Sequence, residues 1–382
     1  VMVSLGEGLM PKGGETPEMG SNPLLGFGRV YARPQVARFL DARVRRLLNH
    51  PGYGFKEFWE EIEQAGITVW GAAIDTLENT SRFASGAETG PMTVIHLFDQ
   101  PITVSRPYEA YMGSLTLPKE VVETAAEQSV LINYRTPRRL VLEAIQRAYP
   151  DVTPENVHVW TLRGPGREAR IGKLWDEWRS LGVQIVDEGW ITPTGIPAFT
   201  DSGTYAPTYL VGRHVDDEGT SHLFLCDGYA ASAEALQAAS LDPILGLETS
   251  LCIFSSKFDV PYDREWDVMR LDPEAADFGD ALAAIIGHTP DAAEMESYAT
   301  NIRAAVDAGL PLGSRTVSVD DFFPRKKWKV LAVASYMLPD PYTGRAGVTE
   351  LSPGLYSVTT QAATRKGIVE VTLKLKILDP LE

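Results

Sequence analysis

The chain has 382 residues, of which 44% are hydrophobic and 23% are charged, as is typical of a globular protein. This length exceeds one ordinary hydrophobic core and predicts two domains. The 35 basic and 51 acidic residues give a net charge of −16, which argues against duplex nucleic acid and anionic membrane surfaces as partners.

The N-terminal part combines a Gly- and Pro-rich segment with helical and strand-like patterns. Residues 1–33 are expected to form a strand and a long loop. Apolar periodicity from Pro34 to about Gln64, broken at Pro51-Gly52, predicts two helices. Apolar runs then predict five strands and two helices: strands at 67–74, 92–98, 101–105, 112–117 and 129–133, and helices at 119–127 and 137–149.

The segment 150–190 changes character and indicates a second domain, from about 151 to 327. It predicts, in order, a strand, a Gly-rich turn, an amphipathic helix and a strand: 157–162, 163–167, 168–181 and 183–186. Such a βαβ unit favours a parallel sheet. A strand at 221–226 and an Ala-rich helix at 229–240 follow. Alternating runs predict antiparallel strands near the C-terminus: 328–336, 354–360 and 367–377.

Cysteine and histidine usage offers no metal motif. Cys226 and Cys252 form no CxxC pair, and the six histidines show no HxxxH spacing, so a zinc site is not expected. We expect reduced, packed thiols. No apolar run reaches transmembrane length, and the first residues lack the basic-then-apolar pattern of a signal peptide. The expectation is a cytoplasmic protein that contacts no membrane.

The most informative pattern lies at the end of the strand predicted at 67–74. That strand delivers Asp75 and Glu78 onto a polar turn, with the hydroxyl of Thr80 two residues later. Two such carboxylates can share a hard divalent cation, and a nearby hydroxyl can orient a metal-bound water. Glu7, between two glycines, could approach the same cation closely or belong to a frayed end. A solvated turn is the structural alternative at 75–80.

A second set of candidates surrounds the Gly-rich turn 163–167. The N–H groups at the start of the following helix could bind phosphate, with charge-assisted contacts from Arg167 and Arg170. Pro165 and the glycine spacing do not fit a dinucleotide fingerprint. Asp187 follows the next strand and would lie near this turn in a parallel sheet, where it could bind a substrate hydroxyl. A plain strand-to-helix connection is the alternative.

Other residues have two interpretations each. Arg135, Arg138 and Arg139 stand at the start of a predicted helix, where positive charge opposes the helix dipole. They indicate either an anionic partner or a solvated helix face. Tyr108 and Tyr111 lie among strands, where tyrosines serve as core-edge aromatics more often than as ligand contacts.

Taken in order, these segments resemble the class II fructose-1,6-bisphosphatases, a family of metal-dependent, lithium-sensitive sugar phosphatases that often also hydrolyse sedoheptulose 1,7-bisphosphate. Residues 73–80 look like the family's metal motif Asp-Pro-(Ile/Leu)-Glu-Gly-Thr, and residues 109–114 like its Asp-Met-Tyr-Met-Glu-Lys. Residues 157–186 resemble its strand, Pro-Arg-His turn, helix and strand, and 187–189 fall on its Asp-Gly-Asp. Residues 222–241 resemble its strand, Gly-Gly-Ala-Pro-Glu-Gly turn and Ala-rich helix.

The resemblance implies an α/β, two-domain layered sugar-phosphatase fold with mixed sheets. Its C-terminal strands return to the N-terminal domain, so that 328–382 joins 1–150. The implied activity is metal-dependent hydrolysis of a sugar (bis)phosphate with Mg²⁺ or Mn²⁺. The resemblance assigns three metal ligands: Asp75, Glu78 and Glu7. It also implies that Thr80 and Asp75 are catalytic, with Thr80 orienting the attacking water, and that four residues bind the sugar phosphate: Tyr111, Arg167, Arg170 and Asp187.

Several positions depart from the family pattern: Thr76, Asn79 and Ser114 replace its Pro, Gly and Lys, and Ala231 replaces a metal-binding Glu, with Glu234 or Asp227 as stand-ins. The family's first, metal-bearing helix has no counterpart unless the helices at 34–64 replace it. These departures favour an alternative, a non-catalytic sugar-phosphate-binding or regulatory member with a degenerate metal site. A nucleotide-binding oxidoreductase, based on 157–190, is a more distant alternative. A homo-oligomer is compatible with the sequence.

Overall fold

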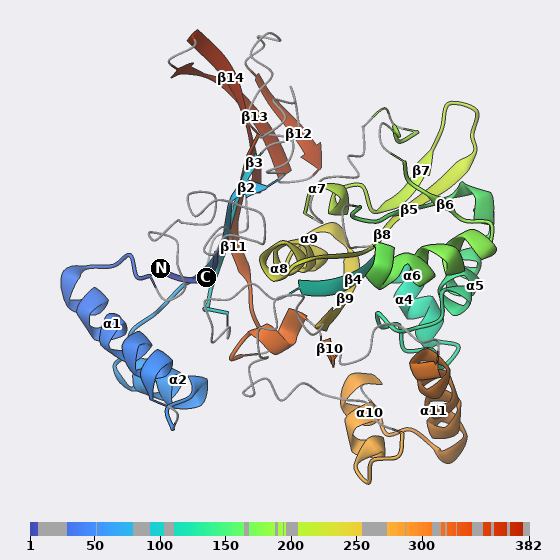
Figure 1. Ribbon diagram of the computed structural model, residues 1–382, viewed down its shortest axis with the longest axis horizontal. Helices are drawn as coiled ribbons and strands as arrows, with labels where there is room; N and C mark the ends of the chain where they lie inside the picture. Colours follow the sequence, from blue (N-terminus) through green and yellow to red (C-terminus); the bar gives the residue numbers. More distant parts are fainter. Residues whose placement is uncertain are drawn as a thin grey trace. The chain divides into compact units, whose positions relative to one another are not determined.

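The structure is a computed structural model in which the chain forms two compact units of mixed α/β structure (Figure 1). Unit 1 comprises Val1–Glu109, Tyr262–Trp266 and Asp320–Glu382, and unit 2 comprises Ala110–Pro261 and Asp267–Val319. The structure describes residues 1–6, 29–50, 52–78, 92–102, 111–163, 168–187, 190–193, 195, 205–253, 273–286, 288–307, 315–317, 319–325, 327–337, 347–352, 355–364 and 367–376.

Unit 1 is built on a seven-stranded sheet of order β1-β2-β3-β11-β14-β13-β12. Its strands are β1 (Met2–Gly6), β2 (Gly71–Glu78), β3 (Met92–Phe98), β11 (Val330–Met337), β12 (Gly347–Ser352), β13 (Leu355–Thr364) and β14 (Gly367–Lys376). β1 and β2 are parallel, and the other neighbouring strands are antiparallel. Because β11 pairs with β3, the C-terminal strands join the N-terminal sheet.

The two helices expected at 34–64 are present as α1 (Pro34–Asn49) and α2 (Phe55–Gln64). Pro34 occupies the first turn of α1, where its fixed φ suits a helix and its missing N–H costs nothing. The apolar faces of the two helices meet in a core that also contains Met2 of β1 and Val69. The helix pair α1–α2 is therefore part of the core of unit 1.

Unit 2 contains a second mixed sheet, of order β10-β9-β4-β8-β5-β6, with β7 paired to β8. Its strands are β4 (Tyr111–Pro118), β5 (Val157–Trp160), β6 (Gln184–Ile185), β7 (Gly212–Val215), β8 (Ser221–Ala231), β9 (Leu247–Ile253) and β10 (Arg315–Val317). β5 is parallel to both β6 and β8, and α6 connects β5 to β6. The βαβ unit expected at 157–186 is thus confirmed.

Helices flank this sheet, and alternation along β8 separates two cores. Leu223 and Leu225 belong to the core that contains α4, α5 and α6, whereas Phe224 and Cys226 belong to another cluster. The helices of unit 2 are α4 (Lys119–Ala126), α5 (Arg138–Ala148), α6 (Glu168–Ser180), α7 (Tyr205–Thr208), α8 (Ser232–Ala239), α9 (Asp242–Leu245), α10 (Phe278–Ile286) and α11 (Ala292–Asp307).

One expected strand, at 129–133, is not observed, and another, at 101–105, lies mostly outside the described residues. Residues 129–133 form an irregular connection, since Ser129 has a φ of 58°. The hydroxyl of Thr136 accepts a hydrogen bond from the backbone N–H of Asn133 and donates one to the carbonyl of Leu131. This apolar run is therefore held by the Thr136 side chain and by backbone hydrogen bonds to the end of α4, and not by a neighbouring strand. Pro101 and Ile102 are not in a strand either, and 103–105 lie outside the described residues.

The division between the units also differs from the boundary expected near residue 150. It falls between Glu109 and Ala110, because β4 pairs with β8 on one side and β9 on the other. These hydrogen bonds make β4 a central strand of unit 2. Similarly, the helix expected from residue 229 begins at Ser232, since β8 continues to Ala231.

Gly113 in β4 allows the ring of Tyr134 to pack against the strand. A Cβ atom at this position would lie 2.4 Å from Cζ of Tyr134. We expect Gly113→Ala to lower the free energy of unfolding by about 1–3 kcal/mol, because the buried ring must move. Gly52→Ala is the matched control, since nothing lies within 4 Å of a Cβ there. Equal urea midpoints for the two variants would contradict the prediction.

Candidate functional site

The carboxylate motif expected to hold a metal begins where β1 and β2 end. The two strands are parallel, and Gly6, the last residue of β1, pairs with Ile74. The next residue of β2 is Asp75, so the end of β1 lies beside the position of Asp75. Glu7 follows Gly6 in the sequence but lies outside the described residues. The topology therefore places the end of β1, the last described residue before Glu7, next to the position of Asp75 in β2.

A register shift in β2 changes the relation between Asp75 and Glu78. Asp75 pairs with Val94 and Glu78 pairs with Met92. Two residues of β2 therefore lie between these pairs, opposite one residue of β3. In a regular strand, residues three apart lie on opposite faces of the sheet. The additional residue of a β-bulge removes this difference. Positions 75 and 78 therefore occupy the same face, as a shared ion requires.

Asp75 is 4% exposed, and a buried carboxylate needs donors or a cation nearby. The side chain of Glu78 is not described, and Thr80 lies outside the described residues. Among the residues that the structure describes, no group of three His, Cys, Asp or Glu side chains is arranged to hold a metal. Of the expected ligands, only Asp75 has a described side chain. Three carboxylates would be a donor set of the kind that suits Mg²⁺ or Mn²⁺.

The residues expected to bind the sugar phosphate belong to unit 2. Arg163, just after β5, forms an ion pair with Asp187, just after β6, with 2.8 Å between Nη1 and Oδ1. Asp187 therefore lies at the end of β5, as the βαβ pattern predicts. Arg167 lies outside the described residues. Arg170 belongs to α6, and its side chain is not described.

Tyr111 lies at the same end of the sheet of unit 2. It is the first residue of β4 and pairs with Ala231, the last residue of β8. Since β8 is parallel to β5, this end is where β5 and β6 lead to Arg163 and Asp187. Glu234 lies in the first turn of α8, which follows β8 directly. Tyr108 lies outside the described residues.

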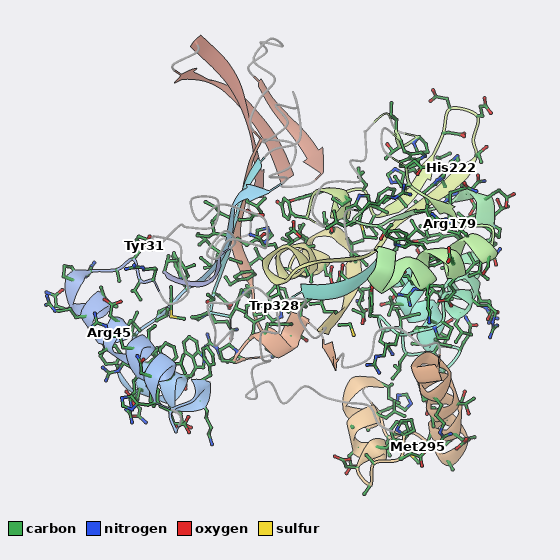
Figure 2. The ribbon with its side chains drawn as sticks, viewed as in Figure 1. Tyr31, Arg45, Arg179, His222, Met295 and Trp328 are labelled. Atoms are coloured by element: carbon green, nitrogen blue, oxygen red, sulfur yellow. The ribbon has the colours of Figure 1, made fainter. Side chains whose placement is uncertain are left out.

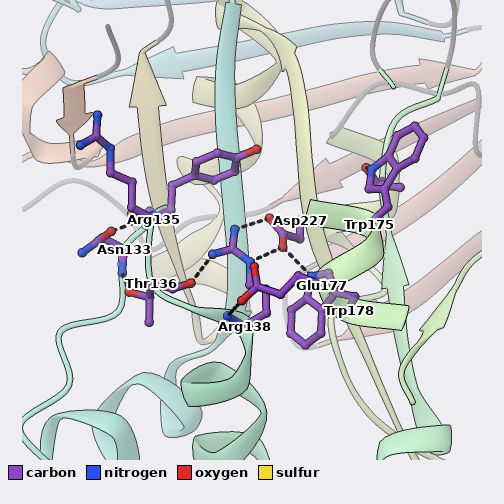
Figure 3. Close-up of polar contacts among 11 residues, drawn as sticks. Asn133, Arg135, Thr136, Arg138, Trp175, Glu177, Trp178 and Asp227 are labelled. Carbon is purple, nitrogen blue, oxygen red and sulfur yellow. Dashed lines mark hydrogen bonds and ion pairs between the residues drawn. The ribbon is translucent and has the colours of Figure 1, made fainter. Parts of the chain in front are cut away.

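The anionic partner of Arg138 is internal, as Figure 3 shows. Its Nε and Nη2 donate to the two carboxylate oxygens of Asp227, at 2.7 and 3.0 Å. Both side chains are 0% exposed. Trp178 Nε1 also donates to Asp227, at 2.7 Å. Burial opposes the charged guanidinium, but the Asp227 carboxylate outweighs it and raises the pKa of Arg138.

This network corrects two sequence interpretations. Asp227 is bonded to Arg138 and Trp178 inside the core, so it cannot replace the metal ligand that is missing at Ala231. The solvated-face interpretation holds for Arg139, which is exposed and pairs with Glu143, but it is wrong for Arg138. The backbone N–H of Arg138 donates to Glu177 of α6, at 2.7 Å. This carboxylate satisfies an N–H at the start of α5.

A histidine cluster in unit 2 was not predicted from the sequence. His158 of β5 and His222 of β8 are hydrogen-bonded, with 3.0 Å between Nε2 and Nδ1. His222 Nε2 lies 3.2 Å from a carboxylate oxygen of Asp216. No HxxxH spacing reveals such a cluster, because its members come from separate strands. A histidine near the start of each of two predicted strands was the available signal.

Comparison of the sequence with protein-family models found no match, and comparison with curated proteins found none either. No helix among the described residues is both long enough and apolar enough to cross a membrane. The described residues form a mixed α/β fold with two mixed sheets.

Proposed function

We propose that this protein is a metal-dependent phosphatase that hydrolyses a sugar (bis)phosphate, with a layered fold similar to that of the fructose-1,6-bisphosphatases. The observation that carries the proposal is the register of β2, in which Asp75 and Glu78 share one face of the sheet beside the end of β1. β-bulges are over-represented next to active sites, where they re-aim a side chain. A cytoplasmic location and a homo-oligomeric state stay predictions.

In the proposed phosphatase each candidate residue has a distinct role. Asp75, Glu78 and Glu7 would hold Mg²⁺ or Mn²⁺ through carboxylate oxygens. The bound ion would neutralise the phosphate and lower the pKa of a coordinated water. Thr80 would orient that water toward phosphorus. Most of the acceleration would come from positioning and electrostatic stabilisation.

The sugar phosphate would be bound by residues of unit 2: Tyr111, Arg167, Arg170 and Asp187. The ion pair between Arg163 and Asp187 supports a polar role for this strand end. Asp187 is exposed, so one carboxylate oxygen could accept a hydrogen bond from a sugar hydroxyl. The start of α6 would add backbone N–H groups for a phosphate.

Phosphate release from a panel of sugar mono- and bisphosphates, with Mg²⁺ or Mn²⁺, tests the proposal. A phosphatase should release phosphate from one or two members of the panel. Absence of release from all of them, by folded protein at high concentration, would contradict it.

One observation favours a second candidate, a non-catalytic sugar-phosphate-binding protein of the same fold. Asp227, a possible substitute for the ligand missing at Ala231, is bonded to Arg138 instead. A degenerate site of this kind should bind a sugar phosphate with equal affinity in Mn²⁺ and in EDTA. The phosphatase should bind Mn²⁺ more tightly when the sugar phosphate is present.

A further inference from the structure

A chain of polar side chains joins β5, β8 and the β7–β8 turn. His158 and His222 are the second residues of β5 and β8, and Asp216 lies in the turn. They therefore lie at the amino ends of these strands, away from the strand ends that lead to Arg163 and Asp187. Figure 2 labels His222 beside the strand pair β7–β8. This series of hydrogen-bonded side chains has no role in the proposed phosphatase.

The carboxylate fixes the direction of the hydrogen bonds. Asp216 accepts from the backbone N–H groups of Glu218 and Thr220, at 3.0 and 2.8 Å. The Thr220 N–H is the main reason that the pKa of Asp216 is lowered. An ionised Asp216 can only accept, so His222 donates through Nε2–H. Its Nδ1 is then the acceptor for Nε2–H of His158.

The environment of His158 opposes a charge on its ring. The pKa of His158 is lowered to about 4, first by burial and then by His222 and His214. Trp190 covers His158, with 4.7 Å between the ring centroids, and also stacks on Phe224 at 5.6 Å. At neutral pH the ring is uncharged and holds the Trp190 side chain on one side and His222 on the other.

Among the described residues, few other charged groups face Asp216, His222 and His158. His214 pairs with His222 across β7 and β8, and its Nε2 lies 2.7 Å from the carbonyl of Leu210. Asp217 and Glu218 are exposed in the turn. Arg213 forms an ion pair with Asp151, and its position on β7 alternates with that of His214. None of these groups supplies a carboxylate that contacts His158.

We propose that Asp216, His222 and His158 form a pH-sensitive latch. At neutral pH their hydrogen bonds hold the β7–β8 turn and the Trp190 side chain in place, and in acid the His158–His222 hydrogen bond breaks. The two histidines can accept one proton without losing the hydrogen bond between them, because a single imidazolium still donates to a neutral ring. A second proton places N–H groups on both facing nitrogens, so neither can accept. The His158–His222 bond is then lost, and two like charges lie 3.0 Å apart at these atoms.

The direction of the pH dependence follows from the lowered pKa. The unfolded chain binds a proton at His158 near pH 6.5, whereas the folded chain binds it near pH 4. The stabilisation is therefore complete above about pH 6.5 and is lost as the pH falls toward about 4.

His158→Gln tests the latch, because glutamine has an amide N–H donor that does not titrate. In the unmodified protein the midpoint temperature of thermal unfolding should decrease when the pH is lowered from 7.5 to 5. In His158→Gln this decrease should be smaller by about 4 °C. His288→Gln is the matched control, since His288 is an exposed histidine of unit 2 whose Nε2 pairs with Glu294. The same fall in His158→Gln as in the unmodified protein would overturn the proposal, as would equal narrowing by the control.

Hydrogen exchange on the unmodified protein keeps the test independent of whether the variant folds. Protection factors in β7, corrected for intrinsic exchange rates, should drop at least tenfold between pH 7 and pH 5. Those in α5 should stay within about twofold over the same range. Equal changes in both elements would show general acid destabilisation and would overturn a local latch.

Discussion

Replacing Arg138 by methionine should lower the free energy of unfolding by about 3–5 kcal/mol. The change leaves the Asp227 carboxylate in the core with Trp178 Nε1 as its remaining described side-chain donor. A buried charge without its counterion is among the most costly defects in a protein. The midpoint of urea unfolding, measured at pH 7, checks this prediction.

Arg139→Met is the matched control, since the neighbouring arginine is exposed and pairs with Glu143 on the surface. It should change stability by less than about 1 kcal/mol. Adding Asp227→Asn to Arg138→Met should recover part of the loss, because the uncompensated charge is removed. Similar midpoints for Arg138→Met and Arg139→Met would show that the buried ion pair is not a main determinant of stability.

Replacing Asp75 by asparagine should abolish metal-dependent phosphate release and weaken Mn²⁺ binding at least tenfold. Asparagine has nearly the same shape but offers a neutral amide oxygen, which is a poorer ligand for a hard cation. Electron paramagnetic resonance of free Mn²⁺ measures the binding directly, in protein shown to be folded by circular dichroism.

Asp41→Asn controls for the loss of one negative charge from unit 1. Asp41 lies on the exposed face of α1, so the variant should bind Mn²⁺ as the unmodified protein does. Unchanged turnover in Asp75→Asn would remove the main support for the metal site, whatever its effect on stability.

Local sequence patterns predicted those elements whose period is set by one apolar face. α1 follows the helical spacing of Phe39, Leu40 and Val44. α2 follows that of Phe55, Phe58 and Ile62, and β3 coincides with the run 92–98. The apolar run at 129–133 was misleading, because burial of Val130 does not require a strand. There the connection between α4 and α5 is held by the Thr136 side chain.

The buried ion pair and the details of the candidate site both depend on long-range contacts that a local pattern does not contain. Asp227 is 89 residues from Arg138 in the sequence, so nothing near either residue predicts their ion pair. The shift in β2 depends on how Asp75 and Glu78 pair with β3. The parallel βαβ unit could be predicted, because its strand, helix and strand follow one another directly.

The most direct test of the central claim is phosphate release in Mn²⁺, then in excess EDTA, and again after Mn²⁺ is restored, with the sugar phosphate that responds best in the panel. A metal-dependent phosphatase should stop releasing phosphate in EDTA and recover when Mn²⁺ returns. Release that continues unchanged in EDTA would contradict the account.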